Sequence, residues 1–281
     1  MLRQIDPKYL RPRLLHRENE SHKGNYGHLL IVAGCETMPG AAVLATGAAL
    51  RSGCGLVTLH SSKRALQAVV NNDPSAMLSE DPRPQFSRVP AALERYTAIA
   101  VGPGLSRDAL SGVALRDMMA AAREAGIPMV VDADALNLIS ENPRMMDLIP
   151  KGSVMTPHIG ELRRLIPFEK GQEEEAAREL SLKSGCVVVL KGYHSKVFSP
   201  DGTCLVNTTG NPGMAKGGSG DVLTGLTGGL MARGYAAIDA AALGVWIHGY
   251  AGDRLTEERT AEAWSSRDLI DRLPAGFKAL Y

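Results

Sequence analysis

Short runs of apolar residues alternate with helix-like stretches along most of the chain. The runs are rich in Val, Ile and Leu with few polar interruptions, which is typical of strands covered on both faces. Helix-like stretches, such as residues 40–52 and 108–125, stand between them. The strand-like runs are HLLIVAG (28–34), LVTLH (56–60), YTAIAVG (96–102), PMVVDAD (128–134), SVMTP (153–157) and CVVVLKG (186–192).

This alternation predicts an α/β fold. Crossovers between parallel strands are almost always right-handed, so the pattern favours a mostly parallel sheet with helices on both faces, in three α/β/α layers. After residue 190 the rhythm changes, because VVVLKG, KVFSP and TCLVNTT follow one another with short turns. These runs predict an antiparallel edge on the same sheet. Helices are predicted afterwards over residues 219–233, 236–255 and 265–273.

The chain shows neither a linker nor an internal repeat. We therefore expect a single domain over residues 1–281, with residues 1–20 as an N-terminal extension. The polar stretch of residues 79–90 carries three prolines and is predicted to be a surface loop.

Charge and cysteine content disfavour several classes of protein. Thirty-one Lys and Arg face thirty Asp and Glu, which leaves a net charge of +1, whereas nucleic-acid binders usually carry a basic excess. No apolar run approaches the roughly 18 residues of a membrane span, and the polar N-terminus lacks an apolar stretch of signal-peptide length. The four cysteines lie far apart, without metal-binding spacing. We expect a cytoplasmic protein with reduced thiols and with neither a nucleic-acid nor a membrane partner.

Small or polar residues follow five of the predicted strands. Ligands of open α/β sheets bind beyond the carboxyl ends of the strands. Each of these ends alone could be an ordinary turn, but five together predict a crevice long enough for a large ligand. They are Ala33-Gly34, Gly102-Pro103-Gly104, Asp132-Ala133-Asp134, Thr156-Pro157-His158 and Lys191-Gly192.

Glycine is concentrated in one segment. The chain holds 30 glycines, and nine of them lie in residues 210–234. Gly217, Gly218, Ser219 and Gly220 stand where a helix begins; unpaired backbone N–H groups and the helix dipole favour an anion there, and glycine lets the backbone approach a phosphate closely. We predict an anion hole over residues 217–220 and interpret the glycine excess as the imprint of a large phosphorylated ligand. The alternative is a simple helix cap formed by Gly220 and Asp221.

Two common nucleotide motifs do not fit this segment. A P-loop needs Lys followed by Ser or Thr, but Lys216 is followed by Gly217. A dinucleotide fingerprint needs G-x-G-x-x-G after the first strand, and residues 34–42 lack it. Asp221 directly follows the anion hole, where the helix dipole stabilises its carboxylate. It is therefore predicted to act as a general base on a substrate hydroxyl.

These residues resemble the ribokinase-like superfamily, whose members carry a glycine-rich anion hole followed by Asp. More closely, the chain resembles the ADP-dependent NAD(P)H-hydrate dehydratase family, from about residue 21 to residue 253. A shared GGSGD alone would be weak evidence for this family, whereas the ordered set of motifs is highly specific for it. The motifs are SHKGNYG (21–27), MPGAAVLA (38–45), RSGCGLVT (51–58), VGPGL (101–105), DADALN (132–137), TPHIGEL (156–162), LKGYHS (190–195) and NTTGNPGMAKGGSGDVLTG (207–225).

The resemblance implies a repair reaction. Hydrated NADH or NADPH (NADHX or NADPHX) loses water, and ADP drives the elimination by conversion to AMP and phosphate. Water is a poor leaving group, and phosphorylation of the ring hydroxyl makes a good one. This chemistry explains why a kinase-like site would serve a dehydratase.

The resemblance also implies roles for individual residues. Asp221 would be the catalytic base, and Mg²⁺ would accompany ADP, the co-substrate, with Glu161 acting through water. Ala42, Gly104, His158 and Asp221 would bind the hydrated substrate. Lys191, Gly192, Tyr193, His194, Ser195 and Gly220 would bind the adenine nucleotide.

The chain departs from family patterns at two positions, and some family members carry an extra epimerase domain on the N-terminal side. Ser195 stands where many members have Thr and keeps the hydroxyl. His158-x-x-Glu161 replaces the Asn-x-x-Glu of many ribokinase-like kinases, which favours a dehydratase. Only about 20 residues precede SHKGNYG, so we expect no epimerase activity. We expect a homo-oligomer, since the small-residue helices at 40–52 and 236–251 could pack against another subunit, and the resemblance favours a tetramer.

Two other functions remain open. A ribokinase-like kinase for a small alcohol would share Asp221 and the anion hole but would release a stable phosphorylated product. A non-enzymatic nucleotide-binding module would tolerate the loss of Asp221. His248, within ALGVWIHGYAGD, is interpreted as a packed core histidine of a helix.

Overall fold

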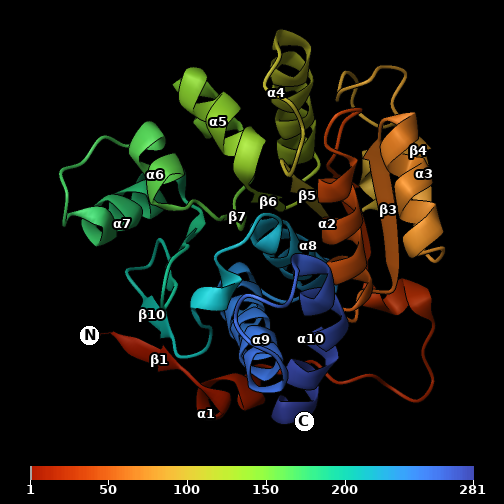
Figure 1. Cartoon of the computed structure of the whole chain (residues 1–281). Helices are drawn as coiled ribbons and strands as arrows, with labels where there is room; N and C mark the ends of the chain where they lie inside the picture. Colours follow the sequence, from red (N-terminus) through yellow and green to blue (C-terminus); the bar gives the residue numbers. More distant parts are fainter. Residues whose placement is uncertain (1) are drawn as a thin grey trace.

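The apolar runs of the sequence lie side by side in one sheet. The structure is a computed structural model that describes residues 2–281, and ten strands form its sheet (Figure 1). In chain order the strands are β1 (Arg3–Ile5), β2 (His28–Val32), β3 (Leu56–Ser61), β4 (Met77–Glu80), β5 (Ala98–Val101), β6 (Met129–Val131), β7 (Val154–Met155), β8 (Val187–Leu190), β9 (Lys196–Phe198) and β10 (Cys204–Asn207).

The sheet runs in the order β1-β10-β9-β8-β7-β6-β5-β2-β3-β4. Within the described residues, β9 alone is antiparallel to its neighbours β8 and β10, and all other strand pairs are parallel. This arrangement confirms the mostly parallel sheet and its antiparallel turn-back after residue 190. Neither edge strand was predicted: β4 pairs in parallel with β3, and β1, of three residues, pairs in parallel with β10, with Arg3 opposite Leu205. Three residues are too few to show a strand period.

Helices cover both faces of the sheet. Figure 1 shows α4 to α7 gathered on one side, and α8, α9 and α10 together on the other. The core next to α1, α2, α3 and α8 to α10 is separate from the core next to α4 to α7. None of the helices in residues 2–281 is both long and apolar enough to cross a bilayer. The helices are α1 (Pro7–Leu10), α2 (Pro39–Leu50), α3 (Lys63–Asn72), α4 (Ala109–Glu124), α5 (Ala133–Glu141), α6 (Ile159–Leu165), α7 (Glu173–Ser184), α8 (Ser219–Ala232), α9 (Ala237–Glu258) and α10 (Ser266–Leu280).

Strand residues alternate between the two cores, as the two-residue period of a strand requires. In β2, Leu29 and Ile31 belong to the core under α8, and Leu30 and Val32 to the core under α4. The face of β5 that meets α8 is built of alanines, including Ala100. These small residues let α8 lie close to the sheet.

Helix α8 also packs unusually close to α2. A Cβ added at Gly225 would lie 1.9 Å from the carbonyl oxygen of Ala45, and one at Gly229 would lie 2.0 Å from Oγ of Ser52. A Cβ at Gly228 would lie 2.9 Å from Cβ of Ala100. The phosphate interpretation is therefore wrong for these three glycines, which permit close packing instead.

The small-residue helices proposed for subunit contact are largely covered within the chain. Four of the five alanines of α2, including Ala45, Ala48 and Ala49, are buried, and α9 packs against both α8 and α10. The homo-oligomer stays a prediction.

The surface-loop prediction for residues 79–90 is wrong for part of the segment. Ser79 and Glu80 belong to β4, which pairs with β3. Asp81 is buried and accepts hydrogen bonds from the backbone N–H groups of Arg83 and Ser87. Phe86 is buried as well. The prolines and polar residues of this segment are typical of a surface loop. The segment instead folds back on the sheet around the carboxylate of Asp81, whose oxygens are hydrogen-bonded.

Candidate active site

A cavity of about 740 Å³ opens beside the start of α8. Residues just beyond the ends of β6, β7 and β8 line it, namely Asp132, His158 and Lys191. Three of the five predicted strand ends thus meet there, while those at Gly34 and Gly104 are outside its lining. A cavity of this size suits a small organic ligand.

The first turn of α8 presents free backbone amides to this cavity. Gly218 precedes the helix at a φ of 85°, a left-handed conformation that glycine adopts without strain. The N–H of Ser219 donates to the carbonyl of Lys216, and the first helical bond runs from Val222 to Gly218. The N–H groups of Gly220 and Asp221 have no partner in residues 2–281, and both residues line the cavity. Of the predicted anion hole, these two amides are available to an anion.

The loop before α8 is fixed by the C-terminal part of the chain. Nζ of Lys216 donates to the carbonyl oxygens of Ala261 and Trp264, at 2.5 and 2.6 Å. Oγ of Ser266, in α10, donates to the carbonyl of Gly217 at 2.8 Å. Lys216 therefore holds the loop in place, and Gly217 lies outside the cavity lining.

The carboxyl group of Asp221 has a pKa close to neutral pH. Burial and the negative charge of Asp132 raise the pKa of Asp221 to about 7, against the opposing influence of Lys191. The sequence led us to expect the helix dipole to dominate and to favour the carboxylate; desolvation and neighbouring carboxylates outweigh it. A carboxyl with this pKa can accept a proton from a hydroxyl and release it again near neutral pH.

Lys191 is the cation of the site. Its Nζ lies 2.6 Å from Oδ1 of Asp132 and 3.6 Å from Oε2 of Glu161. Burial lowers the pKa of Lys191, but these carboxylates outweigh burial and hold its pKa above the ordinary value. A Cβ added at Gly220 would lie 3.4 Å from this Nζ. The ammonium group therefore lies next to the free amides of α8, where it can attract phosphate oxygens.

Asp132 positions this cation; the sequence placed it at a predicted strand end and left its role open between a helix cap and a part in the nucleotide or metal site. It is 1% exposed, and its second oxygen accepts a hydrogen bond of 2.6 Å from Oγ1 of Thr224, in α8. Its position at a strand end and its place in the motif DADALN were the sequence signals. No side-chain capping bond forms at Asp132.

His158 and Glu161 form a capping box at the start of α6. The N–H of His158 donates to Oε2 of Glu161 at 2.8 Å, and the N–H of Glu161 donates to Nδ1 of His158 at 3.2 Å. Both residues line the cavity. The ring of His158 thus caps α6 at the edge of the cavity, and its role in substrate binding stays a prediction.

The carboxylates of the site do not form a resident metal centre. Asp132 uses both oxygens on Lys191 and Thr224, and Glu161 is engaged by His158 and Lys191. No group of three or more His, Cys, Asp or Glu side chains within residues 2–281 is arranged to hold a metal. These residues fit a water-mediated contact to an ion carried by a nucleotide, rather than an ion held by the protein alone.

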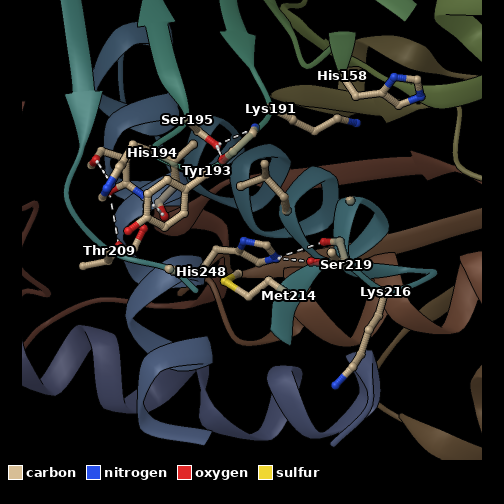
Figure 2. Close-up of a pocket in the computed structure, with 18 of the residues that line it drawn as sticks. His158, Lys191, Tyr193, His194, Ser195, Thr209, Met214, Lys216, Ser219 and His248 are labelled. Carbon is tan, nitrogen blue, oxygen red and sulfur yellow. Dashed lines mark hydrogen bonds between the residues drawn. The ribbon is translucent and has the colours of Figure 1, made fainter. Parts of the chain in front are cut away.

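The turn after β8 forms another wall of the cavity. All of residues 191–195 line it, and Figure 2 shows Tyr193 and His194 side by side there. Tyr193 is 75% exposed, and the two ring centroids are 4.0 Å apart. Nδ1 of His194 lies 3.1 Å from the carbonyl oxygen of Asn207, and Oγ of Ser195 donates to the carbonyl of Gly192. An exposed aromatic ring at a cavity wall is suited to stack on a planar ligand.

Two residues assigned to substrate binding lie outside this lining. Ala42 is 0% exposed, in the core of α2. Gly104 has a φ of 58°, and a Cβ there would lie 2.8 Å from Cβ of Ala41. Their assignment to substrate binding stays a prediction.

Comparisons with known proteins agree with the resemblance. The profile of the NAD(P)H-hydrate dehydratase family matches residues 29–275. The chain is 37% identical over 285 residues to the bifunctional NAD(P)H-hydrate repair enzyme Nnr of Moorella thermoacetica, covering 97% of this chain and 53% of that protein. The chain spans about half the length of such bifunctional relatives.

Solved structures match over the full length of the chain. The ADP/ATP-dependent NAD(P)H-hydrate dehydratase of Bacillus subtilis, co-crystallised with ATP and Mg²⁺, superposes with a TM-score of 0.87 at 31% identity, covering 100% of this chain and 99% of that one. A ribokinase-like superfamily protein from Enterococcus faecalis gives a TM-score of 0.88 at 27% identity, covering 99% and 96%. The ribokinase-like fold expected from the motifs is confirmed.

Proposed function

The chain belongs to the NAD(P)H-hydrate dehydratase family, and on that premise we propose that it restores NADH and NADPH from their hydrates, with ADP as the co-substrate. The observation that carries the proposal is Asp221, with a pKa of about 7, beside two unpartnered amides and the ammonium of Lys191 in one cavity. This combination supplies a base for a hydroxyl and positive charge for a phosphate.

The base would act on the hydroxyl of the hydrated ring. The hydroxyl oxygen bonds to the β-phosphorus of ADP, its proton passes to Asp221, and the bond from that phosphorus to the bridging oxygen breaks, releasing AMP. The phosphorylated ring then eliminates phosphate and a ring proton, which regenerates the dihydronicotinamide. The sum of both steps is hydrate plus ADP to coenzyme, AMP and phosphate.

The first turn of α8 and Lys191 would stabilise the phosphoryl group. Gly220, Asp221 and Lys191 line the same cavity, and a Cβ added at Gly220 would lie 3.4 Å from Nζ of Lys191. Preorganised donors of this kind stabilise developing charge strongly. Asp132 and Thr224 keep Lys191 in place. We propose that Glu161 would contact, through water, a Mg²⁺ ion carried by the nucleotide, and that this ion would supply positive charge to the phosphates.

The remaining site residues would bind the two ligands. Tyr193, His194 and Ser195 would hold the adenine nucleotide, as the family motif implies, and their position on one cavity wall supports this role. His158 would face the hydrate from the start of α6. Gly104, which follows β5, and Ala42, in the first turn of α2, would line the hydrate site.

An absorbance assay tests the proposal. Hydrated NADH, ADP and Mg²⁺ are mixed with the protein, and the near-ultraviolet absorbance of the dihydronicotinamide ring is followed while AMP and phosphate are quantified. We expect one AMP and one phosphate for each coenzyme restored. Failure to restore the coenzyme with either ADP or ATP rejects a dehydratase. Accumulation of a stable phosphorylated hydrate would identify a kinase.

A further inference from the structure

His248 occupies a place in the cavity that no role assigned so far explains. It lies on α9, is 8% exposed and lines the cavity. One ring nitrogen, Nε2, lies 2.9 Å from the carbonyl oxygen of Ser219, in the first turn of α8 (Figure 2). The interpretation as a core histidine accounts for its burial but not for its contact with the cavity.

The bond to Ser219 fixes the proton of the ring. A carbonyl oxygen only accepts hydrogen bonds, so Nε2 carries the hydrogen and donates it. Burial lowers the pKa of His248 to about 4, so the ring is neutral at physiological pH. Its other nitrogen, Nδ1, therefore presents a lone pair and is an acceptor only.

That lone pair is open to the cavity. Nδ1 has no hydrogen-bond partner in the part of the chain that the structure describes. It is not fully buried, in contrast to the fully buried side-chain N and O atoms that lack a partner. The side chains of Met214, Leu223 and Val245 line the same cavity and offer no donor. A largely buried neutral acceptor without a partner favours a ligand group that donates, because a buried polar group without a partner is costly.

We propose that Nδ1 of His248 accepts a hydrogen bond from the nucleoside part of the adenine nucleotide, either from the 6-amino group of the base or from a ribose hydroxyl. This inference rests on the proposed use of ADP. Phosphate oxygens are acceptors and do not suit Nδ1. Ser219 adjoins the free amides of Gly220 and Asp221, and Figure 2 shows His248 between Ser219 and the pair Tyr193 and His194. When the phosphates of a nucleotide bind at these amides and its base binds at Tyr193, its nucleoside part lies beside His248.

Two substitutions separate this role from a structural one. In His248→Gln the side-chain amide reaches the place of Nε2, so it keeps the bond to Ser219 and loses the acceptor at Nδ1. In His248→Asn the amide oxygen takes the place of Nδ1, and the bond to Ser219 is lost. We expect His248→Gln to raise the Kd for ADP by roughly threefold to tenfold, the value of one neutral hydrogen bond. We expect His248→Asn to keep the Kd within about twofold and to lower the Tm more than His248→Gln does.

Calorimetric titration of each variant with ADP gives the Kd without turnover. Analogues then identify the donor: the penalty of His248→Gln vanishes for inosine diphosphate if the 6-amino group donates, and for 2′-deoxy-ADP or 3′-deoxy-ADP if a ribose hydroxyl donates.

An unchanged Kd in His248→Gln, or a penalty of equal size with all three analogues, overturns the inference, while coenzyme restoration by the wild type leaves the proposed function intact. A wild type that binds no ADP overturns both.

Discussion

The two halves of α8 contain the same residue type for opposite reasons. At Gly220, in the first turn, the atom nearest to an added Cβ would be Nζ of Lys191 at 3.4 Å, and at Gly217, in the loop just before the helix, an added Cβ would meet nothing within 4 Å. At Gly225 and Gly229 it would fall within about 2 Å of atoms of Ala45 and Ser52. The first half faces a cavity and the second is pressed against α2.

The difference shows that glycine content alone does not locate a binding site. In the first half, missing side chains leave room for a ligand near free amides. In the second half they let two helices and a sheet approach each other. Substitutions in the first half should therefore change function and spare stability, and those in the second half should do the reverse.

The largest expected effect belongs to Asp221. Asp221→Asn removes the proton acceptor, and we expect kcat to fall by about a thousandfold, within the range of general-base catalysis. The fold should be retained and ADP should still bind, because the amides of the first turn remain. Coenzyme restoration and calorimetric ADP titration measure the two quantities. Activity within tenfold of the wild type would exclude Asp221 as the base.

The pKa of Asp221 predicts two pH dependences. Because the base must be ionised, kcat/KM should rise with pH and level off above about 7. A pKa raised above its ordinary value of 3.8 contributes stability at low pH that is lost as the pH rises towards and through about 7. Asp221→Asn should flatten that part of the stability profile, as measured by urea unfolding across pH. An unchanged profile would mean that the carboxyl group of Asp221 titrates in a different pH range.

The packed half of α8 gives the next largest effect. In Gly225→Ala the new methyl group overlaps the carbonyl of Ala45, a backbone atom that moves only with α2. We expect a loss of about 3 kcal/mol in the free energy of unfolding, at the upper end of typical overpacking costs. Urea unfolding measures it, and kcat per folded molecule should stay near the wild-type value. A stable Gly225→Ala would show that α2 and α8 can separate without cost.

Thr224 lies at the boundary between the two halves and should affect both properties. Thr224→Val keeps the shape of the side chain and removes the 2.6 Å hydrogen bond to Asp132. We expect a loss of about 2 kcal/mol in unfolding free energy, since hydrogen bonds to charged groups are worth about 1.5–3 kcal/mol. ADP affinity should fall too, because Asp132 orients Lys191. Thr224→Ser, which keeps the hydroxyl, is the matched control. If both variants bind ADP alike, the link from Thr224 to Lys191 has no functional effect.

The sequence predicted the sheet well because buried strands carry a strong local signal. The runs at β2, β3, β5, β6 and β8 need only their own residues to be recognised. Strand β1 and the fold of residues 79–90 depend on partners distant in the chain, such as Leu205 for Arg3 and His60 for Asp81, so local pattern could not reveal them.

Within the site, the sequence identified residues but not the forces between them. Asp221 and Lys191 stood out in motifs, yet the pKa of Asp221 depends on Asp132, which approaches only in the folded chain. His248 carried no signal beyond an apolar helix, because its bond to Ser219 spans 29 positions of sequence. Charge balance and hydrogen-bond partners required the structure.

The smallest expected effect makes the sharpest test of the cavity-facing half. In Gly220→Ala the new methyl group lies 3.4 Å from Nζ of Lys191 and 3.7 Å from Oδ2 of Asp132, within the space that the phosphates would use. Alanine favours a helix over glycine by up to about 1 kcal/mol, so the free energy of unfolding should stay level or rise slightly. The Kd for ADP should rise by about tenfold, equivalent to about 1.4 kcal/mol.

Gly217→Ala is the matched control, since its Cβ meets nothing and the residue lies outside the cavity lining. It should bind ADP as the wild type does. Equal loss of affinity in both variants would extend the anion-binding amides back to residue 217, and equal affinity would remove phosphate from the start of α8. Weaker binding at Gly220 alone, without loss of stability, separates a glycine kept open for a ligand from the glycines of the packed half.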